Sequence, residues 1–150
     1  MSKKVDPLAL GNQVCFPLYA CSKEIVRRYK PFLDPLDLTY TQYIAMMVMW
    51  EDKSINVKNM GKRLFLDSGT LTPVLKKLEA KGYIKRTRSK DDERNLIITI
   101  TEEGENLRKK ALSVPAAMGS CVSISQEEAA TLYSLLYKII DGFEDLGEEE

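Results

Sequence analysis

The sequence predicts a mainly α-helical protein with one small β-ribbon, the wing, and with dimerisation helices at both ends. Residues 56–81 form the pattern of two short amphipathic helices joined by a tight connection. Two β-like runs follow, Tyr83–Arg88 and Leu96–Thr101, and a charged loop joins them. Helix, turn, helix and β-ribbon in this order describe a winged helix-turn-helix.

The first helix is expected over about Leu8–Lys30, with Asp6 as its cap and Pro7 at its first position. Its apolar residues cover a wide arc, so the helix is expected to pack against more than one neighbour. Pro17 inside this helix would remove a backbone hydrogen bond and kink the axis. We therefore expect an irregularity beside Cys15.

The second helix is expected over Tyr40–Glu51, after a connection that contains Pro31 and Pro35. Thr39 and Gln42 form a capping-box pattern at its start. Nearly every residue of this helix is apolar and three are methionine, which fills irregular gaps in protein cores. The helix is therefore predicted to be the central buried helix rather than part of a cofactor site.

The two short helices of the module have their own end signals. Asn56 can cap a helix over Val57–Phe65, and Leu66–Gly69 would form the connection. The next helix is expected to end near Lys81, before Gly82, which suits a left-handed helix end. One face of this second helix is predicted to be buried, and it consists of Leu71, Val74, Leu75 and Leu78.

The opposite face of that helix has the composition of a DNA recognition surface. Its start is small and hydroxyl-rich, which lets a helix enter the major groove and donate to base edges, and basic residues that can bind phosphate follow. An ordinary surface helix with solubilising lysines is the alternative. This face consists of Gly69, Thr70, Thr72, Pro73, Lys76 and Lys77.

The charge distribution favours DNA binding. The whole chain holds 22 basic and 22 acidic residues. The segment from Lys53 to Arg94 holds 12 basic and five acidic residues, so it carries a net charge of +7 and the remainder carries −7. A neutral protein that concentrates positive charge on one module shows the pattern of a phosphate-facing surface.

Two more helices are expected after the ribbon. Thr101 can cap a helix that runs to about Val114, where Pro115 interrupts it. Ser125 and Glu128 form a second capping box before the last helix. That helix carries apolar residues at alternating spacings of three and four, which predicts a seam for another helix: Ala129, Leu132, Leu136, Ile139, Phe143 and Leu146.

So small a chain with such apolar terminal helices would expose a large apolar patch, so we expect a homodimer. Residues 6–38 and 102–147 are assigned to dimerisation and residues 39–101 to the winged helix-turn-helix, within one chain of 150 residues.

Composition argues against several other classes. The chain has no histidine, and its three cysteines have neither zinc-site spacing nor the pattern of a secreted disulfide framework, so no metal site and no cofactor are expected. No run approaches the ~20 apolar residues of a membrane span, and no signal region follows the start. A cytoplasmic, reducing compartment is expected.

The motif Leu66–Pro73 (LDSGTLTP), the run Lys76–Glu79 and the triplet Asp92–Arg94 resemble the MarR family of winged-helix repressors. Residues Asn12–Phe16 and Leu38–Tyr43 resemble its organic-hydroperoxide-sensing branch, OhrR. The similarity extends from about residue 10 to residue 143. The LDSGTLTP stretch is specific to this branch and its near relatives, whereas the triplet alone is weak.

The resemblance implies a dimer that binds a pseudo-palindromic double-stranded DNA operator, with the recognition helix in the major groove and the wing in the minor groove. Arg94 would lie at the wing tip, braced by Asp92. The DNA-binding residues expected are Ser68, Thr70, Thr72, Pro73, Lys76, Lys77, Arg86, Arg88, Lys90, Asp92 and Arg94.

The resemblance also implies that Cys15 is a peroxide-reactive thiol, hydrogen-bonded by Tyr29 and Tyr40, with Tyr19 close by. On one helix, 14 residues place Cys15 and Tyr29 ~21 Å apart, so a contact between them would have to cross the dimer. Phenol donors would stabilise the thiolate that attacks an organic hydroperoxide. The alternative is that Cys15 is a buried, inert thiol.

In the resemblance, Cys121 stands where two-cysteine members carry a resolving cysteine, so an intersubunit Cys15–Cys121 disulfide is favoured over capping by a small cellular thiol. Cys21, which is not a family landmark, is expected to be a buried small hydrophobe.

Two other functions stay open: a MarR-type repressor released by a reversible phenolic or drug-like ligand in the dimer cleft, and a thiol peroxidase.

Overall fold

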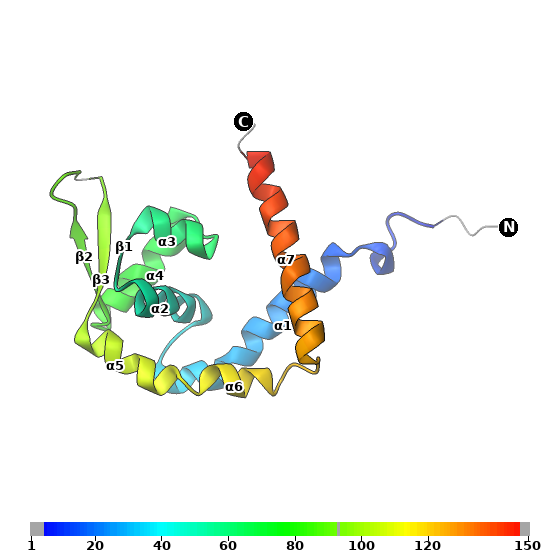
Figure 1. Ribbon diagram of the computed structural model, residues 1–150, viewed down its shortest axis with the longest axis horizontal. Helices are drawn as coiled ribbons and strands as arrows, with labels where there is room; N and C mark the ends of the chain where they lie inside the picture. The colour runs from blue at the N-terminus through cyan, green and yellow to red at the C-terminus, as the bar shows by residue number, and fades with distance from the viewer. Residues whose placement is uncertain (1–4, 93, 148–150) are drawn as a thin grey trace. The chain divides into compact units, whose positions relative to one another are not determined.

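The computed structural model describes residues 5–92 and 94–147, with side chains described as far as Glu144. The side chain of the predicted seam residue Leu146 and the whole of Glu93, in the Asp-Glu-Arg triplet, lie outside this description. The chain forms two compact units, of which the first ends at Met118 and the second begins at Gly119. Figure 1 shows the path of the chain through both.

The first unit is a set of helices around a three-stranded antiparallel sheet, and the second is dominated by one long helix, which confirms the predicted mainly α fold with a small wing. A short 3-10 turn, η1 (Leu10–Asn12), precedes the helices and another, η2 (Asp34–Leu36), follows the first of them. The remaining elements are α1 (Cys15–Leu33), α2 (Tyr40–Asp52), β1 (Ser54–Asn56), α3 (Val57–Leu64), α4 (Ser68–Ala80), β2 (Ile84–Arg88), β3 (Leu96–Ile100), α5 (Glu102–Ala111), α6 (Val114–Gly119) and α7 (Gln126–Gly147).

The first helix begins later than the sequence predicted. Asp6 does not cap it: the Asp6 carboxylate accepts the Leu8 N–H at 2.9 Å and closes a local turn. Because α1 begins at Cys15, Pro17 is its third residue, where a backbone N–H would have no intrahelical acceptor. The predicted kink at Pro17 is therefore wrong, and the irregularity beside Cys15 is the helix start itself.

Four helices of the first unit begin at capping residues. Thr39 and Gln42 form the reciprocal capping box predicted for α2. The side chains of Asn56 and Thr101 accept the N–H of Asn59 at 2.7 Å and of Gly104 at 3.1 Å. Asp67 caps α4 by accepting the Thr70 N–H at 2.7 Å, so Ser68 and Gly69 belong to the helix rather than to the predicted connection. Gly82 has a φ of 81°, as its predicted role at the end of α4 requires.

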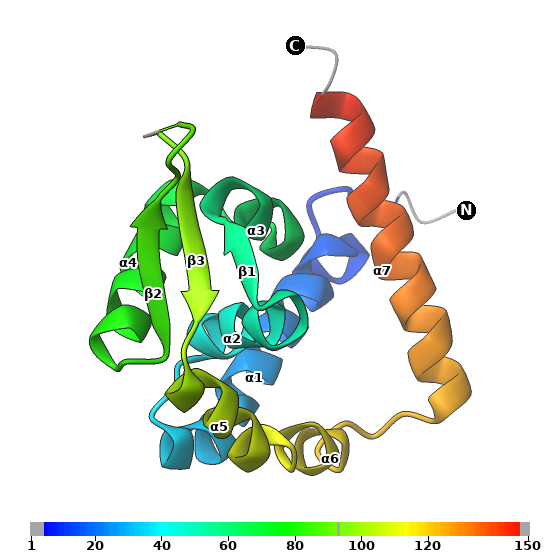
Figure 2. The same ribbon diagram turned by 60° about the vertical axis from the view of Figure 1, so that its left-hand side comes forward.

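The sheet has the order β1-β3-β2, with both pairings antiparallel, as Figure 2 shows. The ribbon of β2 and β3 pairs Ile84 with Ile100 and Arg88 with Leu96. The sequence analysis missed β1, which pairs Ile55 with Ile98. Three residues are too few for an alternation pattern, so only the pairing reveals this strand.

The core of the first unit surrounds α2, as predicted. Met46 and Met49 are completely buried, whereas Met47 lies on the opposite face and is 41% exposed. The predicted inner face of α4 is buried as a whole. The core also takes residues from the segments assigned to dimerisation, namely Leu33, Leu36, Leu38, Leu107, Ala111 and Val114. The ends of those segments therefore stabilise the winged helix-turn-helix directly.

In the second unit, the predicted capping box at Ser125 begins α7. The Ser125 N–H donates to Glu128 at 2.8 Å, and the Glu128 N–H donates back to the serine hydroxyl at 3.1 Å. The apolar seam is open within the described chain: Leu132, Ile139 and Phe143 are all exposed. The apolar side chains Val14, Phe16, Tyr19 and Val26 at α1 are exposed as well.

Candidate functional site

The outward face of α4 carries most of the predicted major-groove residues. Asp67 fixes its first turn through the Thr70 N–H and hydroxyl, and these bonds hold the pKa of the Asp67 carboxyl below its usual value. Because both groups of Thr70 are held, its side chain has a defined position at the helix start. The exposed residues here are Ser68, Gly69, Thr70, Pro73, Lys76 and Lys77, whereas Thr72 is half-buried.

The wing ends in a turn that is built by backbone hydrogen bonds. The Ser89 N–H donates to the Asn95 carbonyl at 2.8 Å, and the Asn95 N–H donates to the Asp92 carbonyl at 2.9 Å. The Asp92 carboxylate accepts the Arg94 backbone N–H at 2.9 Å. Asp92 thus braces the backbone of the turn, and the Arg94 side chain is exposed at the tip, as is Lys90.

Arg86, one of the predicted DNA-binding residues, makes a contact that the sequence analysis did not predict. Its guanidinium donates twice to Glu79 Oε1, at 3.1 and 2.9 Å, and its backbone N–H donates to Glu79 Oε2 at 2.9 Å. These bonds keep the pKa of Glu79 below its usual value. The side chain of Arg86 is 21% exposed, so it joins the root of the wing to α4. Arg88, two residues on, is exposed.

Lys76 offers a test of the major-groove surface. We expect Lys76→Ala to weaken DNA affinity for all sequences alike and to reduce the slope of log affinity against log salt by about 0.9, since one phosphate contact releases about one counterion. Fluorescence anisotropy over a series of salt concentrations measures both quantities. An unchanged slope would place Lys76 away from the phosphates.

Tyr29 and Tyr40 meet in an aromatic cluster between α1 and α2. Their ring centroids are 4.9 Å apart, and Tyr43 lies 5.7 Å from Tyr29 and 6.4 Å from Trp50. Burial raises the pKa of Tyr29, with a further contribution from the neighbouring phenols, and burial raises the pKa of Tyr40. Both phenols therefore stay protonated at neutral pH and can donate hydrogen bonds. The sequence analysis did not place Tyr43 and Trp50 in this cluster, because their contacts depend on how α1 packs on α2.

Cys15 lies at the other end of α1 and is exposed, whereas the alternative interpretation had it buried. Cys15 and Tyr29 both lie in α1, 14 residues apart, as predicted. The side chains of Cys15 and Tyr29 therefore do not meet within one chain. Tyr19, one turn after Cys15, is exposed, and the Lys23 ammonium lies 5.0 Å from its ring centre. The residues on both sides of Cys15 line an apolar hollow: Leu10, Gly11, Asn12, Gln13, Val14, Phe16 and Pro17.

The other two cysteines are also exposed, so the expectation that Cys21 is buried is wrong. Cys121 lies just before α7, in the second unit. Within the residues described, no group of three metal-binding side chains could hold an ion. None of the described helices is long and apolar enough to cross a membrane.

Comparisons with known proteins agree on one family. The family model described as transcriptional regulator SarA/Rot matches residues 27–111. The chain is 45% identical over 141 residues to the organic hydroperoxide resistance transcriptional regulator of Bacillus subtilis. These residues cover 94% of this chain and 96% of that protein. It is 47% identical over 131 residues to the HTH-type transcriptional regulator SarZ of Staphylococcus haemolyticus. These residues cover 87% of this chain and 89% of that protein.

Among solved structures, reduced AbfR bound to DNA superposes with a TM-score of 0.74 at 34% identity, covering 89% of this chain and 94% of that one. AbfR is a protein of Staphylococcus epidermidis, and it has also been solved with a disulfide formed, with a TM-score of 0.63 at 35% identity. These relatives are regulators rather than enzymes, and the chain belongs to the MarR family of winged-helix transcriptional regulators, in the branch of the organic hydroperoxide resistance regulators.

Proposed function

We propose that this protein is a transcriptional repressor that binds a pseudo-palindromic operator as a homodimer and releases it when an organic hydroperoxide oxidises Cys15. The observation that carries the proposal is the pairing of a DNA-binding module with an exposed Cys15 beside an apolar hollow. The 45% identity to a regulator of organic hydroperoxide resistance supports the same inducer. The repressor acts where its DNA lies, in the cytoplasm.

The DNA surface consists of the outward face of α4 and the exposed wing tip. The small start of α4 enters the major groove, and its lysines reach the flanking phosphates. Arg94 enters the minor groove, where its cation meets a negative potential. Arg86 acts indirectly, because its bonds to Glu79 fix the angle between the wing and α4.

The sensor is assembled across the dimer. Cys15 is the first residue of α1, and the positive end of a helix favours an anionic sulfur. The protonated phenols of the partner's copy of the Tyr29–Tyr40 cluster donate hydrogen bonds to this sulfur. The organic group of the peroxide occupies the apolar hollow beside Cys15, so we expect a faster reaction with organic than with inorganic peroxide.

The reaction is a single displacement. The Cys15 thiolate attacks the distal oxygen of the hydroperoxide, a sulfur–oxygen bond forms and the oxygen–oxygen bond breaks. The organic group leaves as its alkoxide, which takes a proton from a phenol or from water. Cys15 is then a sulfenic acid, which is oxidised by two electrons.

Cys121 of the partner chain then resolves the sulfenic acid. Its thiolate attacks the Cys15 sulfur, hydroxide leaves as water after protonation, and an intersubunit disulfide remains. The disulfide form of AbfR supports this step over capping by a small cellular thiol.

The dimer itself is testable. The open seams of α1 and α7 expose apolar side chains that a second copy would bury, so we expect a particle with twice the 17.0 kDa mass of one chain. Light scattering at micromolar concentration measures this mass. A monomeric mass would contradict the proposed assembly, and with it the sensor built across it.

The function is tested by selecting a duplex from a random-sequence DNA pool with the reduced protein. The affinity for the selected duplex is then measured with and without cumene hydroperoxide, and the intact mass of the protein is recorded. We expect release together with loss of the mass of two hydrogens per disulfide. Release by a phenolic ligand without any mass change would favour the reversible-ligand alternative, and failure to select any duplex would contradict DNA binding.

A further inference from the structure

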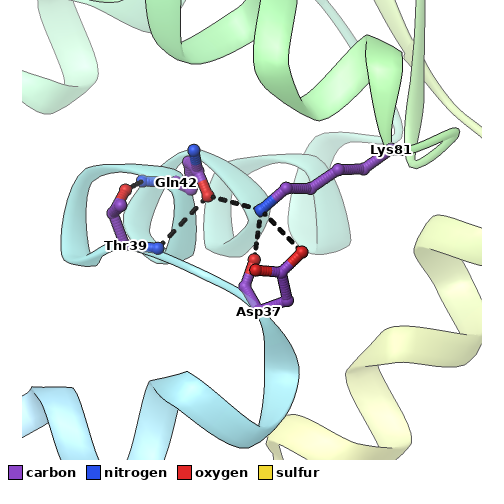
Figure 3. A network of polar contacts seen from close by, with 4 residues as sticks. All are labelled: Asp37, Thr39, Gln42 and Lys81. Carbon is purple, nitrogen blue, oxygen red and sulfur yellow. Dashed lines mark hydrogen bonds and ion pairs between the residues drawn. The ribbon is translucent and has the colours of Figure 1, made fainter.

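Lys81, the C-cap residue directly after α4, does not point into solvent. Its side chain is only 25% exposed, and it reaches back to the segment that joins α1 to α2 (Figure 3). The Lys81 ammonium lies 3.2 Å from the Asp37 carboxylate and 3.2 Å from Gln42 Oε1, and it also donates to the Asp37 carbonyl oxygen. A lysine ammonium has three N–H donors, so these three acceptors use all of them.

Gln42 makes this contact specific. It is a buried polar side chain, 3% exposed, at the start of α2. Its Oε1 atom also accepts the Thr39 N–H at 3.2 Å, which is half of the capping box of α2. A carbonyl oxygen has two lone pairs, so the cap of α2 and the bond to Lys81 together satisfy this buried atom. Loss of Lys81 would leave it half-satisfied.

Asp37 has a backbone conformation that fits the same contact. Its φ and ψ are 53° and 45°, in the left-handed region that non-glycine residues rarely adopt. The Asp37 N–H donates to the Asp34 carbonyl at 2.9 Å. In this turn both the carboxylate and the carbonyl of Asp37 lie toward Lys81 (Figure 3). A strained backbone conformation persists only where surrounding contacts stabilise it. The contacts of Lys81 with Asp37 are part of that stabilisation.

We propose that Lys81 is a positioning residue for operator recognition. It fixes the C-terminal end of the recognition helix α4 to the turn between α1 and α2, and it makes no contact with DNA. This rests on the proposed DNA binding. The turn lies between the helix that carries Tyr29 and the helix that begins with Tyr40, so this clamp of Lys81, Asp37 and Gln42 sets the recognition helix relative to the tyrosine cluster.

The loss of a positioning residue and the loss of a phosphate contact have different effects on DNA affinity and on its salt dependence. A phosphate contact contributes to the affinity for every DNA sequence and to the salt dependence. A positioning residue contributes to the affinity for the selected operator, because base contacts depend on the angle of the helix, and it leaves the number of released counterions unchanged.

The test measures anisotropy for the selected duplex and for a scrambled duplex over a series of salt concentrations. We expect Lys81→Met to weaken binding of the selected duplex about tenfold, the range of one lost base contact, with unchanged affinity for the scrambled duplex and an unchanged salt slope. Asp37→Asn should weaken binding of the selected duplex by a smaller factor than Lys81→Met does. The double variant should bind this duplex no more weakly than Lys81→Met, because both substitutions break the same clamp. The matched control is Lys85→Met, which removes an exposed charge from β2.

Three results would overturn the proposal. They are an unchanged operator affinity of Lys81→Met, an equal loss on both duplexes with a slope reduced by about 0.9, and additive effects of the two substitutions. If circular dichroism shows that Lys81→Met does not fold, Asp37→Asn decides alone, and an unchanged affinity for the selected duplex refutes the clamp. A wild-type protein that selects no duplex refutes the proposed function instead.

Discussion

Replacing Cys15 by serine is expected to leave operator affinity within about twofold of wild type and to abolish release by cumene hydroperoxide. The hydroxyl is nearly isosteric with the thiol, and Cys15 is exposed at the start of α1, so the substitution disturbs no core packing. A serine hydroxyl does not attack the oxygen–oxygen bond, because it stays protonated at neutral pH and its oxygen is a weak nucleophile. Operator binding after peroxide treatment, followed by intact mass, measures both effects.

The other two cysteines provide matched controls. Cys21 lies on the same helix and is also exposed, so the Cys21→Ser variant should respond to peroxide like wild type. Cys121→Ser should still form the sulfenic acid, which gains one oxygen in mass, but should form no intersubunit disulfide on a non-reducing gel. A Cys15→Ser protein that still releases its operator would show that Cys15 is not the trigger.

The helix starts of this fold are largely encoded locally, which is why the sequence predicted them. Thr39, Asn56, Thr101 and Ser125 each accept a hydrogen bond from a backbone N–H three residues later. A signal confined to four residues is readable without knowing the fold. Gly82 is a similar case, since its positive φ is a property of one residue.

The sequence analysis missed features of the structure that depend on contacts between residues far apart in the sequence. The strand β1 exists because Ile55 pairs with Ile98, and the pairing has no trace in three residues of sequence. The contact between Arg86 and Glu79 was not predicted, because these two residues meet only after β2 folds back along α4. Lys81 was taken only as the end of a helix, since its partners lie 39 and 44 residues away.

The start of α1 shows a third kind of difference. The predicted start rested on Asp6 and Pro7, but Asp6 accepts the Leu8 N–H in a local turn, and the carbonyl of Leu10 accepts the Gln13 N–H at 3.1 Å in a 3-10 turn. The residue before α1 makes no side-chain cap, so no local signal marked the true start. The consequence is functional, because the later start places Cys15 at the helix end rather than in its middle.

The second large effect expected is at the wing. Arg94→Ala should lower affinity for the selected operator about tenfold and reduce the salt slope by about 0.9, because the exposed guanidinium at the wing tip is lost from the minor groove. The Asp92 carboxylate bonds only to the backbone N–H of Arg94 among the described contacts, and alanine retains this bond. The turn should therefore keep its conformation, and the thermal midpoint should be unchanged.

Arg86→Lys is the comparison that separates contact from support, since it keeps the charge on the same ribbon. An ammonium cannot reproduce the two bonds that Nε and Nη2 of the guanidinium donate to Glu79 Oε1, so the root of the wing loses its fixed angle to α4. We expect a lower thermal midpoint and weaker operator binding with an unchanged salt slope, whereas Arg94→Ala should reduce the slope and leave the midpoint unchanged. An unchanged midpoint in Arg86→Lys would show that the Glu79 pair does not support the wing.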